Sequence, residues 1–386
     1  MTSAPIADPP MIESATFGEL PMSETTDRAA RVTVTASGLT DPGRVRQNNE
    51  DAFLVAQLAD AADGAAPSEV VTFDADAHAV ILAVSDGMGG ADAGEVASAL
   101  VVQSLRDALM HAEGDLDEAT RRAVEKANRA VWDAAKEPGK RGMGATVTAV
   151  CVQGNQAHIA EVGDSRAYLV RNGRIRQVTR DQSFVQFLVD SGALKPEEAE
   201  KYPMKNVVLQ AMGQNADVQV ALGRLELRRG DRLLLCSDGL SGMVKAEEMR
   251  DAILEEEALD AACRRLVARA NERGGEDNIT VVIAEVTGEA LAPPRDAETL
   301  TQTFQVLAEY RAAAGGDDLS DDDPDDDEPA APLPPAPVAA SPAAPVDHAP
   351  LPIERAPLRV DRGPTVALAV ALGLLVAAIV LLLVRR

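Results

Sequence analysis

Four acidic sites in this chain each lie beside a short apolar run, and this placement limits the folds that the chain can adopt. The sites are Glu50-Asp51, Asp86-Gly87 after the run 79–85, Asp238-Gly239 after the run 233–237, and Asp277-Asn278 before the run 279–283. Carboxylates at the ends of buried strands are costly unless another group compensates their charge. The sites span nearly 230 positions of sequence, so only a folded domain could bring them together.

Carboxylate oxygens gathered at one edge of a sheet suit a hard cation. Mg²⁺ and Mn²⁺ prefer oxygen ligands over nitrogen and sulfur. A single Asp in such a context is more often a helix cap or part of an Asx-turn. The prediction of a cation site therefore depends on all four positions occurring together.

Net charge argues against a nucleic-acid-binding protein, and cysteine spacing argues against a disulfide-bonded or cysteine-metal protein. The formal net charge is -25, and the stretch Asp317–Glu328 carries nine acids and no base, which leaves about -16 for the rest. An acidic body argues against nucleic-acid binding, which needs a basic surface. Cys151, Cys236 and Cys263 show neither metal nor disulfide spacing, and we interpret them as buried thiols of a reducing compartment.

The pattern from residue 31 to about 287 indicates one folded domain. Strand-like segments are 32–36, 145–152, 157–160, 167–170, 175–178 and 279–286, with hairpin turns at Gly154-Asn155 and Asn172-Gly173. Helical periodicity covers 95–110, 116–136 and 247–271, with Asp115 as a candidate N-cap for the second helix. Runs of strands with helices in pairs predict antiparallel sheets covered by helices.

The two ends of the chain differ in composition from this domain. Residues 1–30 lack the apolar core of a secretory signal, and we expect them to be disordered. Residues 288–364 are acidic and then rich in Pro and Ala, which predicts a disordered linker, although 296–314 could form a short amphipathic helix. Residues 365–384 form an unbroken apolar run long enough to cross a bilayer, which predicts a transmembrane helix.

The ordered motifs of the domain resemble a known family. They are Gly43-Arg-Val-Arg-Gln-Asn-Asn-Glu-Asp-Ala52, Ser85-Asp-Gly-Met-Gly-Gly90, Gly144-Ala-Thr146, Gly163-Asp-Ser-Arg166, Ser237-Asp-Gly239 and Gly275-Glu-Asp-Asn278. This order is similar to that of the type 2C metal-dependent Ser/Thr protein phosphatases, bacterial branch, over roughly residues 31–287. The resemblance implies an α+β fold: a four-layer αββα sandwich of two antiparallel sheets flanked by helices.

The resemblance also implies a centre of two Mn²⁺ or Mg²⁺ ions, and it assigns roles to particular residues. The metal carboxylates would be Asp51, Asp86, Asp238 and Asp277, with Gly87 offering a backbone carbonyl. Asp164 matches the ligand of a third, more loosely held ion, with a purely structural role for its motif as the alternative. Glu50 is either an outer-sphere ligand or an ordinary surface acid.

We also expect specific roles for two arginines within these motifs. The resemblance implies that Arg46 clamps the substrate phosphate, a task that the planar bidentate fork of a guanidinium suits. Arg166 would pair with an acid and fix the turn that carries Asp164.

Two positions depart from patterns seen in the family. Some members have His after the second Asp-Gly, a candidate general acid, where this chain has Met88. Met cannot transfer a proton, so another group or water must protonate the leaving oxygen. Gln182 stands in place of His in a Thr-x-Asp-His-Ser pattern, just before the substrate-facing flap expected at 184–215.

We therefore expect a phosphatase that removes phosphate from Ser and Thr of proteins and opposes Ser/Thr kinases. The apolar tail predicts a single-pass protein of the cell membrane with a cytoplasmic catalytic domain. One alternative is a pseudophosphatase that binds phosphoproteins without hydrolysing them. Another is a membrane scaffold whose threonines near 299–303, once phosphorylated, recruit partners.

Overall fold

The computed structural model describes residues 31–59, 66–199, 202–296 and 298–312. These residues belong to one compact unit that ends at Ala312. The predicted segment 1–30 and the predicted transmembrane helix 365–384 lie outside the described residues. No helix within the described ranges is long and apolar enough to cross a membrane.

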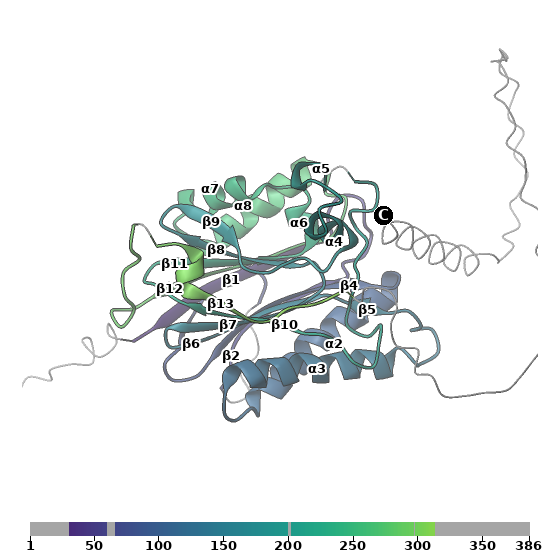
Figure 1. Ribbon diagram of the computed structural model, residues 1–386, viewed down its shortest axis with the longest axis horizontal. Coiled ribbons are helices and arrows are strands. Elements are labelled where there is room, and N and C mark those ends of the chain that lie inside the picture. Colours follow the sequence, from purple (N-terminus) through teal and green to yellow (C-terminus); the bar gives the residue numbers. More distant parts are fainter. Residues whose placement is uncertain (1–30, 60–65, 200–201, 297, 313–386) are drawn as a thin grey trace, which may run out of the picture. The chain divides into compact units, whose positions relative to one another are not determined.

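Two antiparallel sheets stack face to face in this unit, as Figure 1 shows. Sheet A has the order β3-β1-β12-β11-β8-β9, from β1 (Thr33–Asp41), β3 (Val71–Asp74), β8 (Arg166–Arg171), β9 (Arg174–Gln177), β11 (Asp231–Cys236) and β12 (Ile279–Thr287). Sheet B has the order β13-β10-β7-β6-β4-β2, with β5 paired to β4, from β2 (Asp51–Gln57), β4 (Val80–Met88), β5 (Gly144–Ala145), β6 (Val147–Gln153), β7 (Gln156–Val162), β10 (Ala221–Glu226) and β13 (Phe304–Ala308).

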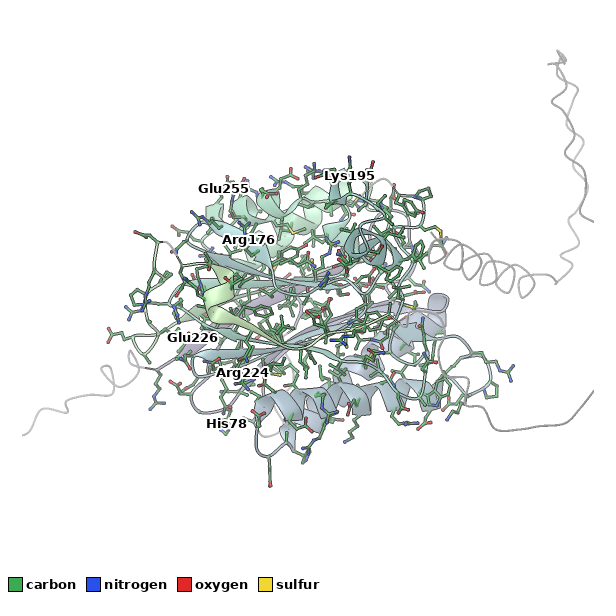
Figure 2. All side chains as sticks on the ribbon, in the orientation of Figure 1. His78, Arg176, Lys195, Arg224, Glu226 and Glu255 are labelled. Carbon is green, nitrogen blue, oxygen red and sulfur yellow. The ribbon has the colours of Figure 1, made fainter. Side chains whose placement is uncertain are left out.

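Helices cover the outer face of each sheet, so the predicted four-layer αββα sandwich is confirmed (Figure 1). The helices α2 (Ala91–Met110) and α3 (Leu116–Ala134) cover sheet B, and α7 (Ala246–Glu255) and α8 (Leu259–Glu272) cover sheet A. Shorter helices are α4 (Phe184–Asp190), α5 (Pro196–Ala199), α6 (Asp238–Ser241) and α9 (Leu300–Thr303). Charged side chains lie on the outside, with Glu255 on α7 and Arg224 on β10 (Figure 2).

Both faces of the central strands are apolar because each strand has helices on one side and a second sheet on the other. In β4, Val80, Leu82 and Val84 enter the core between the sheets, while Ile81 and Ala83 pack under α2 and α3. This alternation follows from the two-residue period of a strand. It also explains why such strands read as continuous apolar runs in the sequence.

The structure corrects two secondary-structure expectations. The helix predicted over 247–271 is two helices, because α7 stops where three acids, Glu255 to Glu257, oppose the helix dipole at its C-terminal end. Arg265 of α8 forms ion pairs with Glu255 and Glu256 across the break. The helix expected over 296–314 is instead the single turn α9 followed by strand β13, which pairs with the free edge of β10.

The segment after β12 thus contains ordered structure inside the range 288–364 that we assigned to a linker. The part of that range beyond Ala312 lies outside the described residues. Both predicted hairpin turns are confirmed: Gly154-Asn155 joins β6 to β7, and Asn172-Gly173 joins β8 to β9 with both residues at positive φ. The expectation of buried thiols is also confirmed, since Cys151, Cys236 and Cys263 are free and buried, and burial raises the pKa of each to about 12.

Candidate metal centre

Asp51 and Asp86 lie side by side because they are register partners on neighbouring strands. Asp51 opens β2, and Asp86 lies near the end of β4 directly opposite it. Antiparallel partners have Cβ atoms roughly 5 Å apart, so the two carboxylates reach the same end of the sheet. Asp238 reaches this site from sheet A, since it begins α6 immediately after β11.

Two hydroxyl groups hold the Asp51 carboxylate in place. Ser237 and Thr280 each donate a hydrogen bond of 2.7 Å to its Oδ2 atom. Its other oxygen, Oδ1, is buried and has no hydrogen-bond partner, and the same is true of Oδ1 of Asp238. A buried carboxylate oxygen without a partner costs free energy, so these two atoms mark where a cation would be stabilised.

The pKa values show how unfavourable this cluster is for negative charge. Burial is the largest cause in each case, and neighbouring carboxylates add to it. These effects raise the pKa of Asp51 and of Asp164 to about 7, against the Ser237 and Thr280 hydrogen bonds to Asp51. The pKa of Asp86 is raised well above its ordinary value, and that of Asp238 is raised as well.

Arg46 and Asp277 form an ion pair at the rim of the site. The Arg46 Nη2 to Asp277 Oδ2 distance is 2.8 Å, and the Arg46 side chain is half exposed. The loop that carries Arg46 packs on the Asp277 loop at Gly43, where an added Cβ would lie 2.3 Å from the Asp277 carbonyl oxygen. The guanidinium is therefore anchored beside the carboxylates and still accessible to a ligand.

Gly87 and Glu50 lie where the backbone is most crowded. A Cβ on Gly87 would lie 2.1 Å from the carbonyl oxygen of Gly94 and 2.6 Å from that of Glu50. The glycine is thus required by close contact between protein segments, a reason that sequence reasoning did not identify. Burial raises the pKa of Glu50, and the facing Arg46 partly opposes this shift.

Asp164 lies in a tight turn between β7 and β8. Gly163 has φ of +108° and packs on Thr146, whose hydroxyl accepts from the Asp86 N–H at 3.0 Å. The expected acid partner of Arg166 is Asp181, which the guanidinium contacts through Nε and Nη2, the latter at 2.6 Å. The prediction that Arg166 pairs with an acid is confirmed by that bidentate pair.

These groups share one open cleft. A cavity of about 540 Å³ is lined by Arg46, Glu50, Asp86, Asp164, Asp238 and Asp277. Asn206 and Val208, from the segment expected to be a flap, line it too. Met88 lies at the same wall, where its sulfur is 3.9 Å from the Gln214 side-chain amide. The structure thus brings together every carboxylate that the sequence analysis assigned to the centre, and Arg46 with them.

The donor set fits divalent cations. Four carboxylates with like-charge repulsion and two unpartnered buried oxygens need positive charge to balance them. Within the described ranges, no group of three or more Asp, Glu, His or Cys side chains is arranged closely enough to hold a metal ion as it stands. The fit therefore rests on the chemistry of the donors and on their common cleft.

The comparison with known families agrees with this geometry. The family model described as Protein phosphatase 2C matches residues 68–282, more than half of the chain. The chain belongs to the protein phosphatase 2C family. The family resemblance noted in the sequence is thereby confirmed.

Similar proteins come from several bacteria. Serine/threonine protein phosphatase PstP of Mycobacterium tuberculosis is 40% identical over 265 residues, which cover 67% of this chain but only 46% of that protein. A serine/threonine phosphatase of Listeria welshimeri is 37% identical over 253 residues, 64% of this chain and 93% of that one. The chain thus spans about half the length of its mycobacterial relative and nearly all of the listerial one.

Solved structures show the same fold. The PstP catalytic domain in complex with two manganese ions is 37% identical with a TM-score of 0.55, covering 66% of this chain and 99% of that one. Stp1 of Staphylococcus aureus is 31% identical with a TM-score of 0.58, covering 66% and 95%. The matched part corresponds to the phosphatase 2C domain described above.

Sequence reasoning did not identify three polar groups of the site. Ser237 and Thr280 orient Asp51, and Asn278 accepts from the Glu50 N–H at 2.8 Å while its amide donates to two loop carbonyls. Each lies next to, or within three positions of, a motif aspartate. Polar residues adjoining a motif acid at a strand end are the signal that would have found them.

Proposed function

We propose that this protein hydrolyses phosphoserine and phosphothreonine in proteins, using two Mn²⁺ or Mg²⁺ ions, and thereby opposes Ser/Thr kinases. The observation that carries the proposal is the convergence of Asp51, Asp86 and Asp238 from separate strand ends, with two buried oxygens left unpartnered. Membership of the phosphatase 2C family and the two manganese ions bound by a similar catalytic domain support it.

The chain's own residues would hold and orient the ions. Asp51, Asp86, Asp238 and Asp277 would supply carboxylate oxygens, with Asp164 beside them for a third ion. When bound, paired divalent ions supply an activated water for in-line attack on phosphorus and stabilise the charge that develops there. The Ser237 and Thr280 hydroxyls keep Asp51 oriented for this task.

Arg46 is the group best placed to bind the substrate phosphate. Its guanidinium is half exposed and lines the cleft, where its Nη2 atom donates to Asp277. A phosphate can occupy its remaining N–H groups through the bidentate geometry that guanidinium favours. Met88 has no proton to give, so the leaving oxygen must take its proton from water or from another group of the cleft.

The test is turnover of a phosphothreonine peptide by the full chain, with Mn²⁺ and with excess chelator. Activity should require the metal, and Asp238→Asn should lower kcat by several orders of magnitude without loss of fold. Asp217→Asn is the matched control, because that side chain is 95% exposed. Equal turnover in chelator would refute metal dependence, and binding without turnover in the parent protein would favour the pseudophosphatase.

We further propose that residues 365–384 anchor the enzyme in the cell membrane with the domain in the cytoplasm. The support is an apolar run of bilayer length after an acidic, Pro-rich stretch. A chain ending at Pro364 should become soluble and keep its kcat on peptides. A truncated chain that still sediments with membranes, or a domain cut by protease outside intact cells, would contradict this.

A further inference from the structure

The segment Glu298–Arg311, which we call the strap, follows the family-matched region and packs back onto the domain. It comprises α9, β13 and the residues after them, and it lies outside residues 68–282. The sequence predicted no contact between this segment and the catalytic site. In the structure its two ends make different contacts with the domain.

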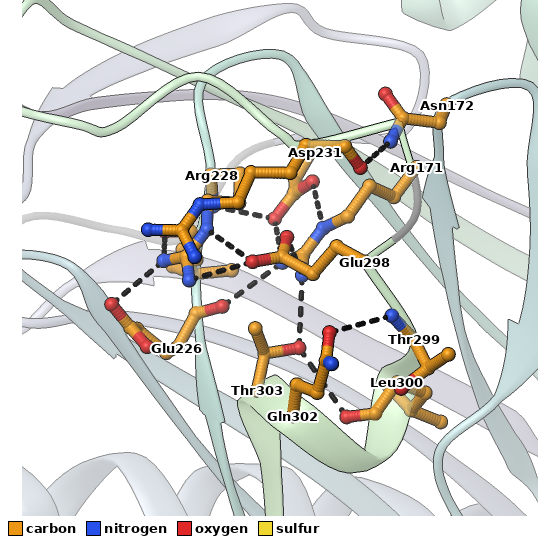
Figure 3. Close-up of polar contacts among 12 residues, drawn as sticks. Arg171, Asn172, Glu226, Arg228, Asp231, Glu298, Thr299, Leu300, Gln302 and Thr303 are labelled. Carbon is orange, nitrogen blue, oxygen red and sulfur yellow. Dashed lines mark hydrogen bonds and ion pairs between the residues drawn. The ribbon is translucent and has the colours of Figure 1, made fainter.

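The first end of the strap is anchored by buried charges (Figure 3). Glu298 accepts from Arg171 at 3.2 Å and from Arg228 at 2.9 Å, and its side chain is 4% exposed. Arg171 also donates to the Thr303 hydroxyl at 2.9 Å and to the buried Asp231. Two buried arginines thus face two buried acids and fix the start of the strap, and the part-exposed Glu226 is a further partner of Arg228.

The middle of the strap is an edge strand of sheet B. Residues Phe304 to Ala308 pair with β10, with a register shift at Leu222/Gly223. The Phe304 ring fills the space over Gly223, where a Cβ would lie 2.6 Å from it. This ring also packs against the core between the two sheets.

The last residues of the strap reach a row of three glutamines. The Arg311 N–H donates to Gln219 Oε1 at 3.2 Å, and the Gln219 N–H donates to Gln210 Oε1 at 2.8 Å. The Gln210 amide donates in turn to Gln182 Oε1 at 2.8 Å. Gln210 also donates to the Gln219 carbonyl, so these two residues are joined twice.

The row ends at the turn that carries Asp164. Gln182 is 2% exposed, and its Oε1 atom accepts from the Gly163 N–H at 3.0 Å. Its amide donates to the Glu161 carbonyl, and its own N–H donates to the Gly163 carbonyl. Gln182 therefore holds the residue directly before Asp164 from two sides.

We propose that the strap is a positioning element for the catalytic centre: through Gln219, Gln210 and Gln182 it holds the Gly163-Asp164 turn in the geometry that a metal ligand needs. The inference rests on the proposed function, because Asp164 matters only as a ligand. A ligand must be held within about 0.5 Å by its supporting contacts. Gln182 stands where the family pattern has His. Its side-chain amide accepts from the Gly163 N–H and donates to the Glu161 carbonyl at the same time.

This chain of hydrogen bonds, which we call the relay, connects Arg311 at the end of the strap to the Gly163 turn of the active site. Displacement of the strap removes the Arg311 contact, so the Gln219 segment and the Gln210 side chain bonded to it are no longer held in place. Gln182 then loses the amide that fixes its Oε1 atom, and the Gly163 turn loosens. Docking of the strap would favour a tight turn, and release would weaken binding of the ion at Asp164.

The experiment is hydrogen–deuterium exchange of the full chain in chelator, following the peptide 161–166 and the peptide 304–308. Gln219→Ala removes the exposed side chain that accepts from the Arg311 N–H, and it leaves the Gln219 backbone bonded to Gln210. It thus cuts the link between the strap and the glutamines while β13 should stay paired. Phe304→Ala should free the strap. Gln305→Ala is the matched control, because that side chain is exposed and makes no hydrogen bond found in the described residues.

Exchange at 161–166 should quicken at least tenfold in Gln219→Ala and in Phe304→Ala and should match the parent in Gln305→Ala. Exchange at 304–308 should quicken only in Phe304→Ala. If Phe304→Ala frees the strap and 161–166 is unchanged, or if Gln219→Ala has no effect there, the proposal is wrong.

A second readout uses the metal itself. The Mn²⁺ concentration for half-maximal phosphopeptide turnover should rise severalfold in Gln219→Ala, with kcat at saturating Mn²⁺ within twofold of the parent. An unchanged Mn²⁺ requirement would also overturn the proposal. A parent protein without turnover would refute the proposed function, whereas the exchange data would still decide whether the strap positions the turn.

Discussion

Two buried clusters of charge in this molecule have opposite balance. The strap anchor joins Arg171 and Arg228 to Asp231 and Glu298, so each acid faces an arginine. The metal centre gathers carboxylates around Asp51 and Asp86, and the two arginines near them, Arg46 and Arg166, are each already paired with an acid. Burial of charge is common to both, so the excess of one sign, and not burial, marks the functional site.

The difference between the two clusters shows in what opposes the rise in the pKa of their buried acids. Burial raises the pKa of Asp231, and the adjacent Arg171 opposes that shift. At Asp51 neighbouring acids add to the effect of burial instead, and only neutral hydroxyls oppose it. The charges of the anchor are therefore compensated within the protein, whereas the carboxylates of the centre need added cations or protons to balance them.

The largest expected effect is on activity at the unbalanced cluster. Asp51→Asn should lower kcat roughly 1,000-fold or more, because a metal ligand is lost. In chelator the same variant should unfold at a higher temperature than the parent, because a buried like charge is removed. Turnover and thermal unfolding measured together check this, and a variant less stable in chelator would break the comparison.

The balanced cluster should respond in the opposite way. Arg171→Met leaves Asp231 buried without its main partner, which should lower the free energy of unfolding by about 3–5 kcal/mol. Because Arg171 touches no group of the metal centre, kcat of the folded protein should change far less than in Asp51→Asn. Denaturant unfolding measures the first quantity. A loss below about 1 kcal/mol would show that the pair adds little to stability.

The two clusters should also differ in pH dependence. Asp51 and Asp164 have folded-state pKa values of about 7, above the ordinary 3.8. Between these values the folded protein binds more protons than the unfolded chain, so its stability falls as pH rises toward 7.

In chelator the free energy of unfolding should therefore fall between pH 5 and 8 by about 2–3 kcal/mol for each of the two carboxyls, with a matching drop in the unfolding temperature. Asp51→Asn should reduce that slope. A stability that rises over the same range would contradict the assignment of the raised pKa values.

The smallest effect concerns the rim pair. Arg46→Ala should raise KM for a phosphopeptide roughly tenfold, since a charge-assisted hydrogen bond contributes about 1.5–3 kcal/mol. The Mn²⁺ requirement should hardly change. A normal KM with weakened Mn²⁺ binding would mean that Arg46 serves to orient Asp277.

Local pattern was enough to predict most strands, because sheets covered on both faces require apolar runs ending at polar residues. Asp86 and Asp238 could be located in this way, and the family resemblance supplied their roles. The strap could not be predicted, because its strand depends on the free edge of β10 and on the space over Gly223. Contacts between Arg171 and Glu298 span 127 positions and leave no trace in either local segment.

The hydrophobic pattern also gave the wrong prediction where a segment fits both a helix and a strand. Residues 300–310 alternate apolar and polar side chains in a way that fits a helix about as well as a strand, and pairing with β10 decides the outcome. Ser237 and Thr280 were missed because a hydroxyl is recognised as an orienting group only when its distance to Asp51 is known.

The three buried cysteines have a practical consequence for watching the strap move. Thiol reagents react with the thiolate, and a pKa of about 12 leaves almost none of it at neutral pH. A new cysteine at exposed Gln305 would then be the one readily labelled thiol in the chain. A dye attached there would report strap docking in the native protein, with no native cysteine to remove first.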